Sequence, residues 1–232
     1  MMPQAITIAQ KDIKTEFRTR EMIFSMVVFS LLIIMAFRFA FEFYLEESTA
    51  ATVSEEVLPL VSPILWVTFC FAGMLGLLTS FAKEKDRGTL DGLMLVPMDR
   101  SAIYFGKVLS NFFLILIVDI ASVVFFSLFF AFDYTGNAVP MFAVILLGTF
   151  GFVVIGTLIS SISVNARGRE VLFAILLIPL ILFTILLPSI TATSLALEGR
   201  IMDAQVELRL LGAFAVIYIA LGYLMFNFVL EE

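Results

Sequence analysis

Six long apolar runs divide this chain, and they constrain its fold more than any other feature. A helix that crosses the hydrocarbon core of a bilayer needs about 20 consecutive, predominantly apolar residues. Runs of this length lie at about 22–41, 58–81, 103–131, 139–162, 171–190 and 210–230. They take up well over half of the 232 residues, so no sizeable water-soluble domain remains. The sequence therefore predicts an all-α, polytopic membrane protein in which residues 1–232 form a single transmembrane domain.

The placement of Lys and Arg predicts how the chain is oriented. An excess of basic residues in the loops marks the cytoplasmic face of a membrane protein. The side shared by the N-terminus and the even-numbered loops carries Lys11, Lys14, Arg18, Arg20, Lys83, Lys85, Arg87, Arg100, Lys107, Arg167 and Arg169. The opposite side carries only Arg200 and Arg209. We therefore expect a multi-pass protein of the cytoplasmic (inner) membrane with both termini in the cytoplasm.

The segment before the first apolar run, residues 1–21, is amphipathic. Apolar side chains recur at helical spacing at Ile6, Ala9, Ile13 and Phe17, with charged residues on the other faces. This pattern favours a helix that lies along the cytoplasmic membrane surface and leads into the first span. The alternative is a frayed, charged leader.

Several kinds of chemistry are missing from the sequence. There is no His, so the chain can form neither a Ser-His-Asp triad nor an imidazole site for a metal or haem. The single cysteine, Cys70, excludes an intrachain disulfide. No phosphate-binding loop is present, because the Gly106-Lys107 pair lacks the upstream Gly and the following Ser or Thr. We expect no catalytic residue, no metal site, no directly bound cofactor and no nucleic-acid partner, although Asp119 leaves an intramembrane enzyme formally open.

Two charged residues, Arg38 and Asp119, lie inside apolar runs, where charges are costly and often functional. At about 1.5 Å per residue, each lies about 24 Å from the start of its run, so the two could pair in the outer half of the membrane. Alternatively, Arg38 extends to the interface or pairs with Glu42, and Asp119 accepts a hydrogen bond from a neighbouring helix.

Prolines divide the fifth apolar run. We expect Pro179 to kink this span, because it removes a backbone donor from the helix. The span should end at Pro188, before the polar stretch 189–194. Residues 195–209 mix apolar and charged side chains and predict a short helix on the outer surface.

The loop at 82–102 is too polar to lie in hydrocarbon, yet Leu90, Leu93, Met94 and Leu95 give it an apolar face. Gly88 allows a turn at one end and Pro97 stops a helix at the other. The pattern predicts a short cytoplasmic helix over 88–96 that docks onto something outside the membrane. A solvated loop with incidental leucines is the alternative.

The order Glu84-Lys85-Asp86-Arg87-Gly88-Thr89-Leu90-Asp91-Gly92-Leu93-Met94-Leu95-Val96-Pro97 resembles the cytoplasmic loop between the second and third spans of ABC-2-type transporter permeases. The closer resemblance is to the haem exporter B (CcmB) family of cytochrome c maturation. It extends through residues 17–21, 71–77 and 99–107 and through the fifth span around Pro179, and thus covers nearly the whole chain.

The resemblance implies a permease homodimer with a separate ABC ATPase subunit and haem-handling membrane subunits of the cytochrome c maturation complex. The residues expected to couple to the ATPase are Glu84, Lys85, Asp86, Gly88, Thr89, Leu90, Asp91, Leu93, Met94 and Pro97. ATP would be bound by the partner, and haem would be handled by the complex. The implied function is haem export or ATP-driven release of a haem-loaded chaperone. The alternatives are a non-transporting membrane scaffold and an ABC-2 permease for another substrate.

Overall fold

The computed structural model describes residues 2–46, 50–86, 88, 100–132, 134, 136–164 and 166–229. Every element within these ranges is helical, which confirms the all-α prediction. In chain order they are α1 (Met2–Thr19), α2 (Glu21–Glu46), α3 (Ala50–Asp86), α5 (Arg100–Phe130), α6 (Ala138–Ser163), α7 (Arg169–Ile181), the π-helical turn η1 (Leu182–Leu186), α8 (Leu187–Leu197), the 3-10 turn η2 (Ile201–Ala204) and α9 (Gln205–Val229).

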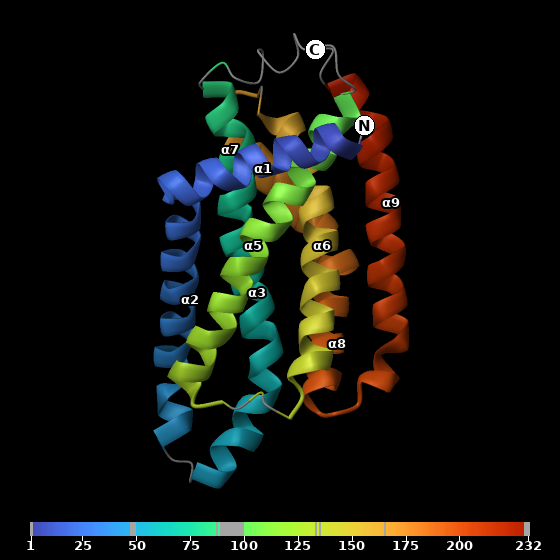
Figure 1. The fold of residues 1–232 in the computed structure, drawn as a ribbon. Helices are drawn as coiled ribbons and strands as arrows, with labels where there is room; N and C mark the ends of the chain where they lie inside the picture. The colour runs from blue at the N-terminus through green and yellow to red at the C-terminus, as the bar shows by residue number, and fades with distance from the viewer. Residues whose placement is uncertain are drawn as a thin grey trace.

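Six helical segments of the described chain are long and apolar enough to cross a membrane, as predicted: Glu21–Phe41, Leu58–Lys83, Ser101–Phe130, Ala138–Ser163, Arg169–Leu197 and Ile201–Met225. They form one upright bundle, and α1 lies across it near the end where α9 also finishes (Figure 1). We call this the α1 end. The first four segments agree closely with the apolar runs of the sequence, whereas the last two do not.

The fifth span does not end at Pro188. After α7, the chain passes through the π-helical turn η1 into α8, which continues to Leu197. Pro188 lies in the first turn of α8, where a missing backbone N–H disturbs the helix least. Part of the polar stretch is buried inside the bundle: Thr191 is exposed, but Ser189 and Thr193 are buried, and the indole Nε1 of Trp66 donates to Thr193 Oγ1 at 2.8 Å. A hydrogen-bonded hydroxyl is compatible with a buried helix, so the prolines and polar residues did not stop the span.

The outer-surface helix predicted for residues 195–209 is also absent. Its first residues complete α8, and its last belong to α9. The connection between them is a turn at Gly199, with φ +74°, followed by the single turn η2. A positive φ is a common way to end a helix, and glycine adopts it without strain.

The packing is organised around α3 and α6. In their apolar stretches 67% and 72% of the residues are buried, compared with 22% in α2 and 22% in the last span. Close contact between the two helices depends on small residues of α6. A Cβ at Gly156 would collide with Leu77 of α3, and Ser160 Oγ donates to the Leu77 carbonyl at 2.7 Å. These two helices therefore form the centre, and the others surround them.

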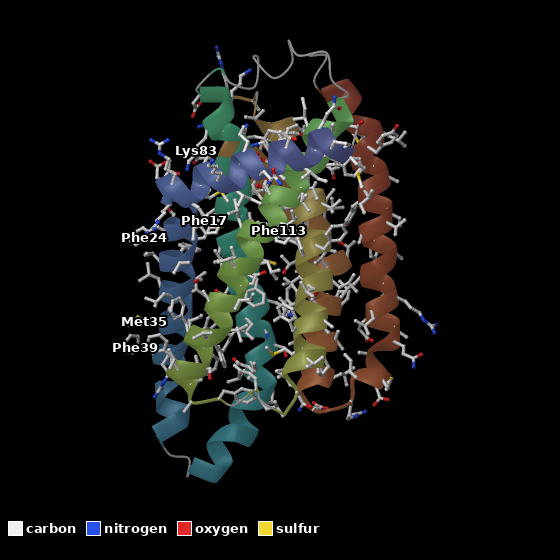
Figure 2. The ribbon with its side chains drawn as sticks, in the orientation of Figure 1. Phe17, Phe24, Met35, Phe39, Lys83 and Phe113 are labelled. Atoms are coloured by element: carbon white, nitrogen blue, oxygen red, sulfur yellow. The ribbon has the colours of Figure 1, made fainter. Side chains whose placement is uncertain are left out.

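Helix α1 exists as predicted, and only part of its predicted apolar face is buried. Its Ala5, Ile8 and Ala9 are buried, and α1 packs chiefly on α5. Two members of the predicted apolar face, Ile6 and Phe17, are 46% and 51% exposed. Figure 2 shows Phe17 on the side of α1 that is turned towards the opposite end of the bundle. The apolar side chains of α1 thus divide between two faces, one packed on α5 and one exposed on the surface of the bundle.

Candidate functional site: a charged cluster between α1, α3 and α5

A buried ion pair holds α1 against α5. Lys107 of α5 is only 2% exposed, and its Nζ lies 2.9 Å from Asp12 Oδ2 of α1. The same ammonium lies 5.5 Å from the centroid of the Phe81 ring of α3, within the range of a cation–π interaction. A buried ammonium is tolerated only when it is paired, so this contact fixes the position of α1.

Glu16 fixes the corner between α1 and α2. Its Oε1 accepts hydrogen bonds from the backbone N–H groups of Met22 at 2.6 Å and Ile23 at 3.1 Å. These donors lie in the first turn of α2, where backbone N–H groups have no partner within the helix and a negative charge is stabilised. The chain turns from α1 into α2 just before them at Arg20, which has φ +58°. Glu16 therefore acts as the capping residue of α2, although it belongs to α1.

Lys83, near the end of α3, joins the same cluster. Its Nζ lies 3.1 Å from a carboxylate oxygen of Glu21 and 3.6 Å from one of Glu16. Next to it is a polar pocket of about 270 Å³, lined by Lys11, Asp12, Thr15, Glu16, Met22, Ser80, Lys83, Lys107, Ser110, Asn111 and Leu114. The lining carries three basic and two acidic side chains, and the ion pairs of Lys83 with Glu16 and of Lys107 with Asp12 join different helices.

A polar layer one turn further into the bundle extends the cluster to α6. Ser80 Oγ donates to Asn111 Oδ1 at 2.9 Å, and Asn111 Nδ2 donates to Thr157 Oγ1 at 3.2 Å. The side chain of Asn111 thus connects α3, α5 and α6 through buried hydrogen bonds. Inside a membrane-spanning bundle such bonds hold helices in register.

A second ion pair joins the end of α3 to the start of α7. The guanidinium of Arg169 donates to both carboxylate oxygens of Asp86, at 3.0 and 3.2 Å. These hydrogen bonds hold the pKa of the Asp86 carboxyl below its usual range. Because both side chains are accessible to solvent, the pair contributes little to stability, but its bidentate geometry orients α7 relative to α3.

Only part of the predicted coupling loop lies within the described residues. Helix α3 extends to Asp86, so residues 82–86 of this loop are helical, and Glu84 and Lys85 belong to the last turn. Gly88 has φ +65° and donates its N–H to the Lys85 carbonyl at 3.0 Å. The remaining candidates, Thr89, Leu90, Asp91, Leu93, Met94 and Pro97, lie outside the described residues. The helix over 88–96 stays a prediction.

Arg38 and Asp119 do not pair. The guanidinium Nε of Arg38 donates to the Phe129 carbonyl at 3.2 Å, whereas Asp119 Oδ2 accepts a hydrogen bond from Thr149 Oγ1 at 2.7 Å. Phe129 is ten residues beyond Asp119, or about 15 Å along α5. The sequence predicted equal depths because Arg38 and Asp119 lie at equal distances from the starts of their spans. Equal distances mean equal depths only when both helices are upright, and α5 is tilted across the bundle (Figure 1). The alternative partner of Arg38, the Glu42 carboxylate, lies outside the described side chains.

The sequence reasoning missed the residues that form the charged cluster. Lys107 contributes to the basic residues that indicate orientation, but it also lies inside an apolar run, where a charge requires a partner. Asp12 and Glu16 are four residues apart, and this spacing places two carboxylates on one face of α1. A search for the partner of Lys107 would have pointed to that face.

These features together define a class of protein: a multi-pass, six-span membrane protein with a charged cluster at the α1 end of the bundle and, within the described residues, no group of side chains that could hold a metal ion. The model of the family described as CcmB protein matches residues 3–231, and the chain belongs to this family. It is therefore a membrane component of the haem export system of cytochrome c maturation. No curated protein matches the chain closely enough to be counted as a relative.

Proposed function

We propose that this chain is the permease subunit of an ABC transporter complex in cytochrome c maturation and couples a separate ATPase to the membrane partners of that complex. The observation that carries the proposal is the membership of residues 3–231 in the CcmB family. The loop after α3, with its run of leucines between charged residues, would contact the ATPase. ATP hydrolysis takes place in the partner, and the complex either exports haem or releases a haem-loaded chaperone.

The charged cluster offers a physical route for this coupling. The end of α3 directly precedes the loop, and it contacts three other helices through two side chains. Lys83 binds the carboxylates at the corner of α1 and α2, and Asp86 binds Arg169 at the start of α7. A displacement of the loop would therefore shift α1 and α7 together, because rigid helices transmit movement through such contacts.

The same proposal sets the orientation and the partners. The α1 end, which carries most of the basic residues, faces the cytoplasm in the cytoplasmic (inner) membrane. The permease acts as a homodimer beside the haem-handling membrane subunits. We expect haem to be held by those partners, because this chain contains no His, the usual ligand of haem iron; ligation by the thioether of one of its 11 Met is the alternative.

The experiment is copurification with the ATPase after coexpression. Replacing Leu90 and Leu93 by Asp should abolish the association, because burial of an apolar side chain contributes about 1.5–3 kcal/mol and a buried carboxylate costs more. The matched control is Met202→Asp with Val206→Asp, which adds the same two charges at exposed positions at the other end of the bundle. Copurification of the double variant at the wild-type level would refute the assignment of the loop.

A second arm separates a transporter from a scaffold. An ATPase variant that binds ATP without hydrolysing it is coexpressed with the wild-type chain. Loss of cytochrome c maturation with an intact complex supports the permease. Full maturation would show that the chain is only a scaffold.

A further inference from the structure

Asp119 occupies the middle of a membrane-spanning helix. It is 18 residues from Ser101 and 11 residues from Phe130, the two ends of its span, which correspond to about 27 and 17 Å along the axis. Its side chain is 1% exposed, and none of the contacts of the charged cluster reaches it. The group is therefore an ionisable side chain in the hydrocarbon region that the proposed ATPase coupling does not use.

The hydrogen bonding of this carboxyl group is incomplete. Oδ2 accepts the hydroxyl proton of Thr149 from α6 at 2.7 Å. Oδ1 is buried and has no hydrogen-bond partner. An ionised carboxylate usually accepts several hydrogen bonds when it is buried, and a neutral acid accepts fewer. The single bond to Oδ2 suits the carbonyl oxygen of a neutral acid, with the proton on Oδ1.

No cation compensates Asp119 within the described residues. From α3, the ionisable group close enough to interact with it electrostatically is the Cys70 thiol, which brings no positive charge. From α2, Arg38 binds the Phe129 carbonyl instead. From α9, Tyr218 donates to Thr184.

The nearest charges along α5 and α1 are also remote. Lys107 is twelve residues from Asp119, about 18 Å along the helix, and it is paired with Asp12. From α6, the group that faces Asp119 is the neutral Thr149 hydroxyl. An uncompensated carboxylate at this depth would be expelled or neutralised.

We propose that Asp119 is a proton-binding site: it is a neutral carboxylic acid in the packed subunit, and it releases its proton when the contact with Thr149 opens to water. In that step the Oδ1–H bond breaks, the proton passes to water and the carboxylate is left hydrated. The packing of α5 on α6 would thus be linked to proton binding. This property goes beyond the proposed coupling to an ATPase, since nothing in that coupling requires it.

The test is infrared spectroscopy of the purified chain in lipid nanodiscs at about pH 6, two units above the ordinary pKa of an exposed Asp. The expected result is a carbonyl-stretch band of a protonated carboxylic acid that shifts in D₂O. Asp119→Asn should remove this band, because the amide keeps the shape of the neutral acid but has no such absorption. Thr149→Val should keep the band and move it to higher frequency, because the carbonyl loses the hydrogen bond from the hydroxyl.

The matched control is Asp203→Asn, at an aspartate whose carboxylate is 2.9 Å from the Arg200 guanidinium. That carboxylate is exposed and forms an ion pair, so its replacement should leave the band unchanged. Absence of the band in the wild-type chain, or its persistence in Asp119→Asn, would overturn the proposal. The Thr149→Val variant retains the carboxyl group, so it gives an answer even if Asp119→Asn fails to fold.

Discussion

Removal of the carboxylate at Asp12 is the most informative perturbation of this structure. The side chain of Lys107 is 3% exposed, so its ammonium has little access to water, and Asp12 Oδ2 lies 2.9 Å away. Breaking a buried ion pair by removing one partner costs about 3–5 kcal/mol. The ring of Phe81 still faces the ammonium, which places the expected loss at the lower end, about 3 kcal/mol. We therefore expect α1 to separate from α5 more than 100-fold more often in Asp12→Ala.

A buried cysteine on α1 measures this separation. Ala9 is 2% exposed in α1, so a cysteine placed there in a Cys70→Ser background reacts with a thiol reagent only when α1 moves away. When opening is fast and reversible, the labelling rate follows the opening equilibrium, so Asp12→Ala should raise it by about two orders of magnitude. The control is Asp203→Ala, which breaks an exposed ion pair with Arg200 and should change the rate less than fivefold.

The pair itself is tested by a double substitution. Asp12→Leu with Lys107→Met replaces the ion pair by apolar side chains of similar size. This change should restore much of the slow labelling, since an apolar pair can replace a buried ion pair at little cost. If Asp12→Ala raises the labelling rate no more than the Asp203→Ala control does, the ion pair between Asp12 and Lys107 does not hold α1 in place.

Three further predictions concern packing, topology and catalysis. Gly148→Ala should lower the free energy of unfolding by about 1–3 kcal/mol, because the added Cβ would collide with the Trp66 ring. The control Gly212→Ala meets no neighbour and should be neutral or slightly stabilising. The fluorescence of the single Trp in mixed micelles measures the unfolding of both variants. In intact cells, a cysteine at Asp203 should react with an impermeant thiol reagent and one at Asp86 should not, and the reverse pattern would invert the proposed orientation. The purified chain should hydrolyse ATP no faster than a mock preparation, and turnover by the pure chain would contradict the permease assignment.

The number and type of the elements could be predicted because crossing a bilayer is a requirement on consecutive residues. Each span must bury its own backbone hydrogen bonds in a helix and must present about 20 apolar side chains to lipid. Those conditions can be read along the chain, and the first four spans agree with the sequence almost to the residue. The coupling role of the loop at 82–102 rests on the order of its residues, and both this role and the helix over 88–96 stay predictions.

The fifth span shows where local rules fail. Pro188 and the polar stretch after it are typical of a helix end, yet α8 passes through both. The hydroxyl of Thr193 is satisfied by Trp66, which comes from a different helix. A residue that stops a helix in water can continue it in a bundle when a neighbour supplies the missing hydrogen bond. No pattern within the span reveals that neighbour.

What the sequence alone determined is the set of six spans, the charged, leucine-containing loop and the family of the protein. What only the tertiary structure decided is the partner of each intramembrane charge. Lys107 pairs with Asp12 and Asp119 binds Thr149, because α1 lies across α5 and α5 is tilted against its neighbours. Hydrophobicity depends on residues that are adjacent in the chain, whereas electrostatic pairing depends on distances between helices, and these are set by how the whole bundle packs.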